Sequence, residues 1–546
     1  MKKLGKKLVA LGLTLSMFAL PLAGCGGSGD GAQTTAAGGS GDGGAESTAA
    51  AEVSGGLSSL EDGVLDIGVT VSWETLTPFR SNIANNVPFA YAAYETLAKL
   101  TGDKEYIPWV AKSWESAGDG VTYNVEIYDY VTDSAGNSIT ANDIKWMIDE
   151  SKEAGLKPCF SKVDHVDVTG DYTLQIVMTE DMVGAFEQIL TNTFVVSQAA
   201  YEGSKDQFAT EIISTSSYLM TEFVADSVIS FEKRDDYWQK EELIEPQNAA
   251  NVEKLSFHLI KEASQAGIAL ETKTVDAFVQ LDQNTATQFE GNPDFTLKAM
   301  SYINGYQLYF SGDESRIITD DLNLRQAICY AIDTEGLING VFAGYGQKMH
   351  DPIADTSVGY LEKWKDEEYY DYNPDKAREL LEQSDYNGET LVLLATSGST
   401  MQRLCQMIQG YLLEVGINLE LNLVDTALYT ATRLDGSQYD MTINTVGGDS
   451  LPDHWSIRYD CYAYSTGDAT GRHDEELAEL LRTTWTQAGF TEENIDAVHN
   501  YLKDNMYAYG MVQPENIDVW RSDLGLQEAV VTNKGSVNFL SSVYGE

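Results

Sequence analysis

The sequence predicts an α/β protein with one large folded body that follows a separate N-terminal segment. Residues 61–546 form a stretch of about 490 residues, which is long enough for two or three domains with substantial cores. Val64–Val71 alternates as a strand does, and Phe89–Leu100 has the apolar spacing of a helix. An apolar run of about 18 residues, the length that crosses a bilayer, does not occur in this stretch. We therefore expect strands and helices packed together outside the hydrocarbon layer.

The N-terminal segment resembles the signal of a bacterial lipoprotein. Residues 2–7 are rich in lysine, Leu8–Leu20 is apolar, and the small-residue stretch Leu22–Cys25 ends in a thiol. This resemblance implies that residues 1–24 are removed and that a lipid such as palmitate is attached to Cys25. An ordinary signal peptide, or one spanning helix with a chance cysteine, is the alternative. The apolar run is shorter than the roughly 20 residues that a spanning helix needs.

A tether is expected after Cys25. Residues 26–59 consist mainly of Gly, Ser, Ala and Thr, which cannot bury a core, so residues 25–60 are predicted to be the lipid-bearing cysteine and a flexible linker. The localisation that follows is extracytoplasmic, on the cell membrane, through the lipid alone.

The charge of the chain excludes one class of partner. Its 84 acidic residues against 35 basic ones give a net charge of −49, which repels phosphate backbones and anionic lipid headgroups. We therefore expect no nucleic-acid partner.

The body contains four further cysteines: Cys159, Cys329, Cys405 and Cys461. They have no metal-binding spacing. Cys329 and Cys405 lie in apolar helical patterns, which favours buried thiols, but up to two disulfides are left open.

The order of motifs along the body resembles one protein family. Each motif alone is weak, but together they cover nearly all of residues 61–546 in the order typical of the extracellular solute-binding proteins of family 5, the peptide and nickel class that serves ABC importers. The motifs are Ile107–Glu115 (IPWVAKSWE), Gly120–Ile127 (GVTYNVEI), Ile139–Ile144 (ITANDI), Phe231–Trp238 (FEKRDDYW), Glu271–Phe278 (ETKTVDAF), Asp321–Asp333 (DLNLRQAICYAID) and Tyr372–Leu381 (YNPDKARELL).

This resemblance implies a two-lobed periplasmic-binding-protein-like fold of type II. It implies a ligand cleft between the lobes and two hinge crossings, near Tyr309–Gly312 and near Gly510–Pro514. Lobe 1 is expected at residues 61–308, with an inserted subdomain at about 105–220 and a return at 511–546, and lobe 2 at 309–510. The implied function is capture of an oligopeptide outside the membrane and its delivery to an ABC permease, by a monomer without a cofactor.

The resemblance also points to Asp449 as a ligand-binding residue. Thr445–Asp453 is a glycine-rich loop after a predicted strand, and Asp449 matches the aspartate that holds a peptide's amino terminus in peptide-binding relatives. A fixed carboxylate suits a partly desolvated ammonium group. The family's tryptophan and tyrosine are replaced here by Val446 and Ser450, and a turn-forming aspartate beside glycines is the alternative.

Two further loops carry candidate ligand contacts. Trp73 follows the first strand with Ser72 and Glu74, and Tyr302, Asn304 and Tyr306 precede the crossing into the second lobe. Their aromatic faces would flank an extended ligand, or stack on sugar rings if the cargo is an oligosaccharide. Burial in the hinge is the alternative.

The sequence contains weaker signals for functions other than peptide binding. His350 and His454 suggest a nickel chelate, but the six histidines have no paired spacing, so no metal site is predicted. The motifs of hydrolases, zinc proteases and nucleotide enzymes do not occur, and we predict no enzyme, although carboxylate pairs leave a glycosidase open. A surface sensor or adhesin on the same fold is the third alternative.

Overall fold

The structure is a computed structural model, and it describes residues 56–73, 75–79, 88–302, 304–448, 450–459 and 474–545. The predicted signal, Cys25, most of the predicted linker, Glu74, Asp449 and Cys461 lie outside these residues. In the described part of the chain, no helix has both the length and the apolar character needed to cross a membrane.

The first group of strands is built around β1. The predicted strand at Val64–Val71 is confirmed as Leu65–Val69, whose residues 65, 67 and 69 are buried. β1 is parallel to β10 and β11, and the other neighbours in this sheet pair antiparallel. The strands are β1 (Leu65–Val69), β8 (Tyr218–Val224), β9 (Val228–Lys233), β10 (Lys254–Leu259), β11 (Ala277–Leu281) and β12 (Phe295–Ser301).

Smaller sheets and helices complete this part, which we call the first lobe. One sheet has the order β4-β5-β7-β6, and β2 with β3 and β19 with β20 form separate pairs. The strands are β2 (Ala98–Leu100), β3 (Tyr106–Pro108), β4 (Ala111–Ser116), β5 (Thr122–Ile127), β6 (Val163–Gly170), β7 (Thr173–Met178), β19 (Leu526–Glu528) and β20 (Val543–Tyr544). The helices are α1 (Ala90–Ala93), α2 (Ala141–Ala154), α3 (Ala185–Asn192), α4 (Gln198–Gly203), α5 (Ala263–Glu271) and α6 (Gln283–Ala286).

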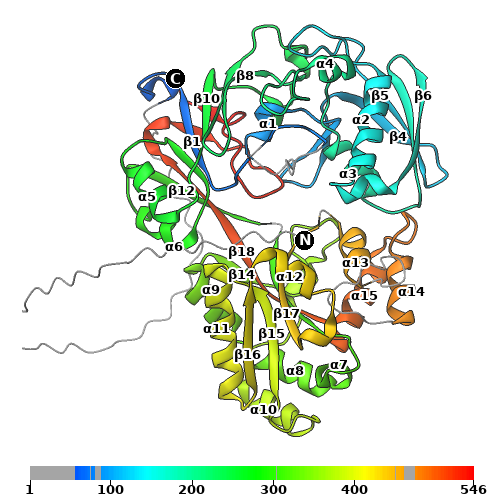
Figure 1. Cartoon of the computed structure of the whole chain (residues 1–546), viewed down its shortest axis with the longest axis vertical. Helices are drawn as coiled ribbons and strands as arrows, with labels where there is room; N and C mark the ends of the chain where they lie inside the picture. The colour runs from blue at the N-terminus through cyan, green and yellow to red at the C-terminus, as the bar shows by residue number, and fades with distance from the viewer. Residues whose placement is uncertain are drawn as a thin grey trace, which may run out of the picture. The chain divides into compact units, whose positions relative to one another are not determined.

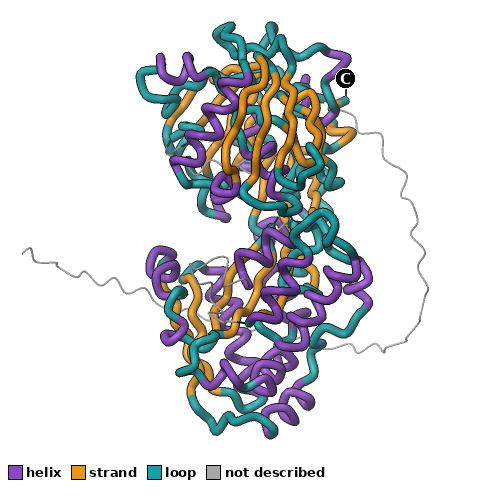
Figure 2. The backbone as a smooth tube through the Cα atoms, turned by 90° about the vertical axis from the view of Figure 1, so that its right-hand side faces the viewer, coloured by secondary structure: helices purple, strands orange, loops and turns teal. Residues whose placement is uncertain are grey.

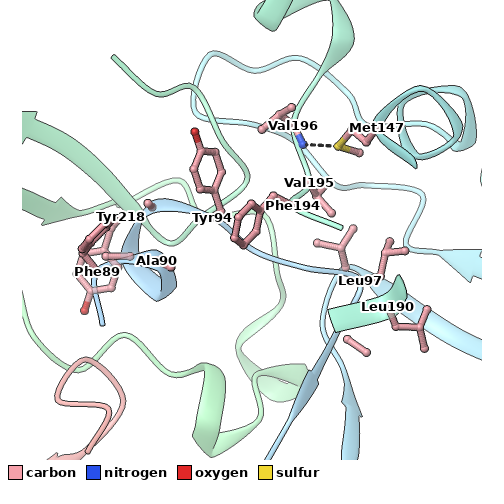
Figure 3. Close-up of a cluster of buried hydrophobic side chains, with 14 of the residues drawn as sticks. Phe89, Ala90, Tyr94, Leu97, Met147, Leu190, Phe194, Val195, Val196 and Tyr218 are labelled. Atoms are coloured by element: carbon pink, nitrogen blue, oxygen red, sulfur yellow. Dashed lines mark hydrogen bonds between the residues drawn. The ribbon is translucent and has the colours of Figure 1, made fainter. Parts of the chain in front are cut away.

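The predicted helix at Phe89–Leu100 is wrong. Only α1 is helical there, and Ala98–Leu100 pairs antiparallel with Tyr106–Pro108 as a strand. Tyr94 stacks on Phe194 at a centroid distance of 5.0 Å, and Figure 3 shows both rings in the apolar cluster of the first lobe. Because this segment is buried on all sides, tertiary packing rather than helical periodicity decides its conformation.

The second group of strands has the order β16-β15-β17-β13-β18, and with its helices we call it the second lobe. β15 is parallel to β16 and β17, and β13 is antiparallel to β17 and β18. The strands are β13 (Gly305–Phe310), β14 (Gly346–Lys348), β15 (Thr390–Thr396), β16 (Asn418–Val424), β17 (Met441–Val446) and β18 (Ala508–Arg521).

Helices follow and cover the strands of this lobe. They are α7 (Ile317–Asp320), α8 (Leu322–Ala331), α9 (Thr334–Phe342), α10 (Pro374–Glu382), α11 (Ser399–Glu414), α12 (Thr426–Thr432), α13 (Leu451–Tyr459), α14 (Glu475–Thr483) and α15 (Glu492–Asn505). Asn373 and Pro374 start α10, because the Asn373 side chain accepts a hydrogen bond from the amide of Lys376 and Pro374 is the first helical residue. Asp453, expected in a loop, lies in the first turn of α13.

One long strand, β18, belongs to both groups. Its first half pairs with β13 and β14, and its second half pairs with β11 and β12. The change of partner falls between Pro514, opposite Gly346, and Glu515, opposite Ser301. Figure 1 shows β18 running from one group of strands to the other, and Figure 2 shows the two groups with helices around each. This arrangement confirms the two-lobed α/β fold, while the expected residue boundaries of the lobes stay a prediction.

The two lobes have separate apolar cores. One cluster joins buried residues from Leu65 to Leu540 through the first lobe, and another joins buried residues from Leu308 to Val512 in the second. Cys159, Cys329 and Cys405 are free and buried, as expected for the latter two. Their burial raises the pKa of each thiol, so they are inert packing residues.

Candidate ligand-binding site

A cavity of about 260 Å³ lies where the two lobes meet. Residues of the first lobe form most of its wall, and Thr356 and Val358 of the second lobe close it. The lining residues are Leu100, Thr101, Gly102, Lys104, Met300, Ser301, Thr356, Val358, Val531, Thr532, Asn533 and Gly535. Side chains from both lobes therefore reach one space, as a cleft that closes on a ligand requires.

Other hollows in the described part of the chain are less suited to a ligand held between lobes. A void of about 20 Å³ beside Trp109 has room for little more than one water molecule. An open hollow of about 560 Å³ beside Tyr128 is lined by residues of the first lobe alone.

The turn between β2 and β3 brings Lys104 to the cavity. Thr101 closes the turn, because its amide donates to the carbonyl of Glu105 over 2.9 Å and its carbonyl accepts from the amide of Lys104 over 3.1 Å. Lys104 has a left-handed φ of +65°, which is uncommon for a residue with a side chain. Its ammonium reaches the second lobe and donates to the carbonyl of Asp355 over 3.0 Å.

A second turn, near the C-terminus, lies against the first. Thr101 and Thr532 form an antiparallel bridge, and a Cβ at Gly102 would lie 3.0 Å from the carbonyl oxygen of Val531. Asp518 of β18 accepts hydrogen bonds from the amides of Gln280 and Val537 over 2.8 and 2.5 Å. These bonds fix the segment that carries Thr532 and Asn533 into the wall of the cavity.

A network of hydrogen bonds holds the wall of the second lobe. The carboxylate of Asp355 accepts from Lys365 over 2.8 Å and from Gln347 and Gln513 over 2.9 Å each. Burial acts to raise the pKa of Asp355, but these three bonds outweigh it and the pKa is lowered. Asp355 therefore stays ionised. Thr356 beside it lines the cavity, and its buried Oγ1 has no hydrogen-bond partner among the residues that the structure describes.

Lys104 gives the cavity wall a positively charged group. Burial lowers its pKa, and Asp355 and Glu362 act in the opposite direction. An ammonium in this position can bind a ligand carboxylate by a charge-assisted hydrogen bond.

Tyr302 and Asn304 lie beside the cavity, next to its lining residue Ser301. The Asn304 amide donates to the Tyr302 hydroxyl over 2.7 Å, and Gln513 donates to the Tyr302 carbonyl over 2.7 Å. Tyr306 instead packs on Phe342 in the second lobe, with ring centroids 5.1 Å apart, and burial raises its pKa to about 12. The structure therefore brings Tyr302 and Asn304 together, and the contact of each of the three residues with a ligand stays a prediction.

Trp73 lies in the core of the first lobe. It is 3% exposed, its ring meets Phe89 edge-on at 5.2 Å, and its indole nitrogen donates to the carbonyl of Val224 over 3.4 Å. This packing favours the buried-aromatic alternative for Trp73 over a ligand contact.

The loop that carries Asp449 adjoins the cavity at both of its described ends. The carbonyl of Gly448 accepts from the Ser357 hydroxyl over 2.7 Å, and Ser450 forms a parallel bridge with Val358. Asp449 itself lies outside the described residues, so its role as an amine anchor stays a prediction.

Sequence reasoning missed the two turns that form the cavity. Thr101–Glu105 reads Thr-Gly-Asp-Lys-Glu between two β-rich stretches, which is a hairpin signal, and Thr532–Gly535 has the same polar, glycine-containing composition. Neither stretch indicates that the two meet. Among the described residues, no group of three or more His, Cys, Asp or Glu is arranged to hold a metal ion.

The comparison with known families decides the identity of this fold. The model described as bacterial extracellular solute-binding proteins, family 5 Middle, matches residues 105–469. The chain belongs to this family. This family 5 protein is therefore the substrate-binding protein of an ABC importer, and proteins of the family work outside the cytoplasm with ABC permeases.

Relatives of this family 5 protein include proteins named for different cargoes and solved structures with a similar fold. The glutathione-binding protein of Pectobacterium atrosepticum is 24% identical over 439 residues, which is 79% of each chain. The ABC transporter substrate-binding protein CtaP from Listeria monocytogenes has a TM-score of 0.75 at 20% identity, over 88% of this chain and 99% of the other. The periplasmic binding protein DppA from Helicobacter pylori, in complex with the peptide STSA, has a TM-score of 0.70 at 20% identity, over 89% and 98%.

Proposed function

We propose that this family 5 protein captures short peptides between its two lobes and delivers them to an ABC permease. The observation that carries the proposal is the lining of the interlobe cavity, which has hydroxyl, amide and ammonium groups and, among its described residues, no aromatic side chain. Peptides are bound mainly through their main-chain groups, which such a lining can satisfy. An oligosaccharide would be expected to stack on tyrosine or tryptophan faces instead.

The size of the cavity favours the short end of the peptide range. At about 260 Å³ it lies near the lower bound of small-molecule pockets, about 300 Å³. A peptide of about two to four residues suits this volume better than a long oligopeptide. The relatives that bind glutathione or the peptide STSA support the same size class.

The charges suggest how the peptide is oriented. Lys104 of the first lobe would hold the terminal carboxylate, and Asp449 of the second lobe would hold the terminal ammonium, as the family resemblance implies. The protein would act as a monomer beside the membrane, held by a lipid on Cys25.

A ligand screen by thermal unfolding tests the proposal. The purified protein is heated with pools of dipeptides to hexapeptides, with oligosaccharides, and with nickel–histidine chelates. A ligand at 100 times its Kd adds about 2.7 kcal/mol of stability, enough to raise the midpoint visibly. We expect a shift with the pools of two to four residues. A shift with oligosaccharides or nickel chelates alone would overturn the peptide assignment.

A further inference from the structure

The two lobes meet a second time, at residues that do not line the cavity. On the first lobe these residues are Lys162, Val183, Gly184 and Gln188, and on the second lobe they are Ser450, Asp453 and Trp485. We call this contact the interlobe clasp. Figure 1 shows α3, which carries Gln188, and α13, which carries Asp453, facing each other across the lobes.

An ion pair forms the centre of the clasp. The Lys162 ammonium lies 2.6 Å from a carboxylate oxygen of Asp453, and the two side chains are only 8% and 13% exposed. The Gln188 amide donates to the other carboxylate oxygen over 2.8 Å. Two partners from the first lobe therefore satisfy one carboxylate of the second. Because the two charges come from different lobes, the pair forms only when the lobes meet.

Close packing surrounds this pair. The amide of Val183 donates to the carbonyl of Trp485 over 2.7 Å, and the Trp485 side chain packs against the apolar core of the first lobe. Gly184 has a φ of +85°, and a Cβ there would lie 2.6 Å from the Ser450 hydroxyl. A glycine at this position lets the two backbones approach, so the local sequence fits the closed contact.

We propose that the interlobe clasp sets the balance between the open and closed forms and thereby tunes ligand affinity. Lys162, Gln188 and Asp453 are positioning residues, because none of them lines the cavity. A contact made only in the closed form shifts the population toward it, and the apparent affinity rises with the fraction of molecules that are competent to bind. This inference rests on the proposed function only in that the ligand is held between the lobes.

Removal of one charge should open the lobes. In Asp453→Asn, the closed form loses the ion pair that joins the two lobes, so its stability relative to the open form falls. We expect a larger radius of gyration without ligand in small-angle X-ray scattering. Ligand affinity should be weaker by about tenfold or more, and the radius at ligand saturation should equal that of the wild type. Lys162→Met should act in the same direction.

Two controls accompany these variants: an exposed ion pair within one lobe, and an exchange of the two charges of the clasp. Lys112 and Glu126 also lie 2.6 Å apart, but they are 50% and 44% exposed and belong to one lobe, so Lys112→Met should change neither the scattering nor the affinity. The exchange of Lys162→Asp with Asp453→Lys should restore at least part of the closed population.

The scattering readout separates this inference from the proposed function. The radius of gyration is measured without ligand. The clasp can therefore be tested even if the thermal screen finds no peptide ligand. An unchanged radius without ligand in folded Asp453→Asn and Lys162→Met would refute the clasp. The clasp would also be refuted if the double variant, with Lys162→Asp and Asp453→Lys, had as large a radius of gyration as the single variants.

Discussion

Replacement of Lys104 by methionine tests how the cavity recognises an anionic ligand group. Lys104 is the lining residue that brings a positive charge into the cavity, and its ammonium bridges to the second lobe through the carbonyl of Asp355. Methionine keeps the length and the apolar stem of the side chain and removes the charge. The loss in affinity therefore reports the ammonium rather than the packing.

The expected magnitude follows from the environment of the ammonium. A hydrogen bond to a charged group contributes about 1.5–3 kcal/mol. The side chain of Lys104 is exposed, so solvent screens part of this contribution and reduces it to about 1–2 kcal/mol. This corresponds to a loss of roughly 5- to 30-fold in affinity for a peptide with a free carboxyl terminus.

The assay is a two-by-two comparison by isothermal titration calorimetry. Wild type and Lys104→Met are each titrated with the peptide found by the screen and with the same peptide amidated at its carboxyl terminus. We expect the variant to lose affinity for the acid and to bind the amide as the wild type does. Lys145→Met, which removes an exposed lysine of α2 paired with Asp149, is the matched control.

The pH dependence gives an internal check. Although Lys104 is exposed by surface area, partial desolvation by the groups around its ammonium lowers its pKa, so the ammonium loses its proton at a lower pH than an ordinary lysine does. The preference of the wild type for the acid over the amide should therefore fade before pH 10.5, the ordinary lysine pKa. An equal loss for acid and amide in Lys104→Met would show that Lys104 does not contact the carboxylate, and the orientation proposed for the peptide would be wrong.

Three further changes test other parts of the argument. Asp449→Ala should weaken binding by about 2–5 kcal/mol for peptides with a free amino terminus and leave N-acetylated peptides unaffected, as calorimetry can measure. Cys25→Ala should move the protein from the membrane fraction to the soluble fraction in a sedimentation assay, and continued sedimentation would refute lipid attachment there. Burial raises the pKa of Asp518 from 3.8 to about 7, so its stabilising effect falls as the pH rises through this window. Asp518→Asn lacks this titration, so its free energy of unfolding should gain on that of the wild type between pH 4 and 7 by up to about 1.4 kcal/mol per pH unit, and its melting midpoint should rise relative to the wild type. Parallel melting curves would contradict the burial argument.

Strands and caps with a strong local signal were predictable from the sequence. β1 alternates because Leu65, Ile67 and Val69 enter the core, and α10 begins where Asn373 and Pro374 supply a cap and a fixed φ. In each case a few neighbouring residues decide the conformation. The same local reasoning failed at Phe89–Leu100, because Ala98 pairs with Pro108 across a hairpin and the segment is buried on all sides.

The cavity was not predictable because its walls come from distant parts of the chain. Lys104, Thr356 and Asn533 meet only after β12, β13 and β18 have placed the lobes. The sequence pointed instead to aromatic residues, and Trp73 shows why this signal is weak, since a large ring with one polar atom serves a core as well as a ligand. The family resemblance pointed to the loop at Asp449, whose described ends contact Ser357 and the lining residue Val358, and the role of Asp449 stays a prediction.

If Asp449 binds the ligand as proposed, the segment from Gly448 to Asp453 links ligand capture to the interlobe clasp. The carbonyl of Gly448 accepts a hydrogen bond from Ser357, and Ser450 forms a β-bridge with the lining residue Val358. Asp453 forms an ion pair with Lys162 of the other lobe. A ligand ammonium bound at Asp449 would act within four residues of the charge that holds the clasp. The free energy gained at the ligand and the free energy gained at the clasp then favour the same closed form. Each should strengthen the other, and the coupling is reciprocal by linkage. A peptide should therefore close the lobes less completely in Asp453→Asn at the same sub-saturating concentration.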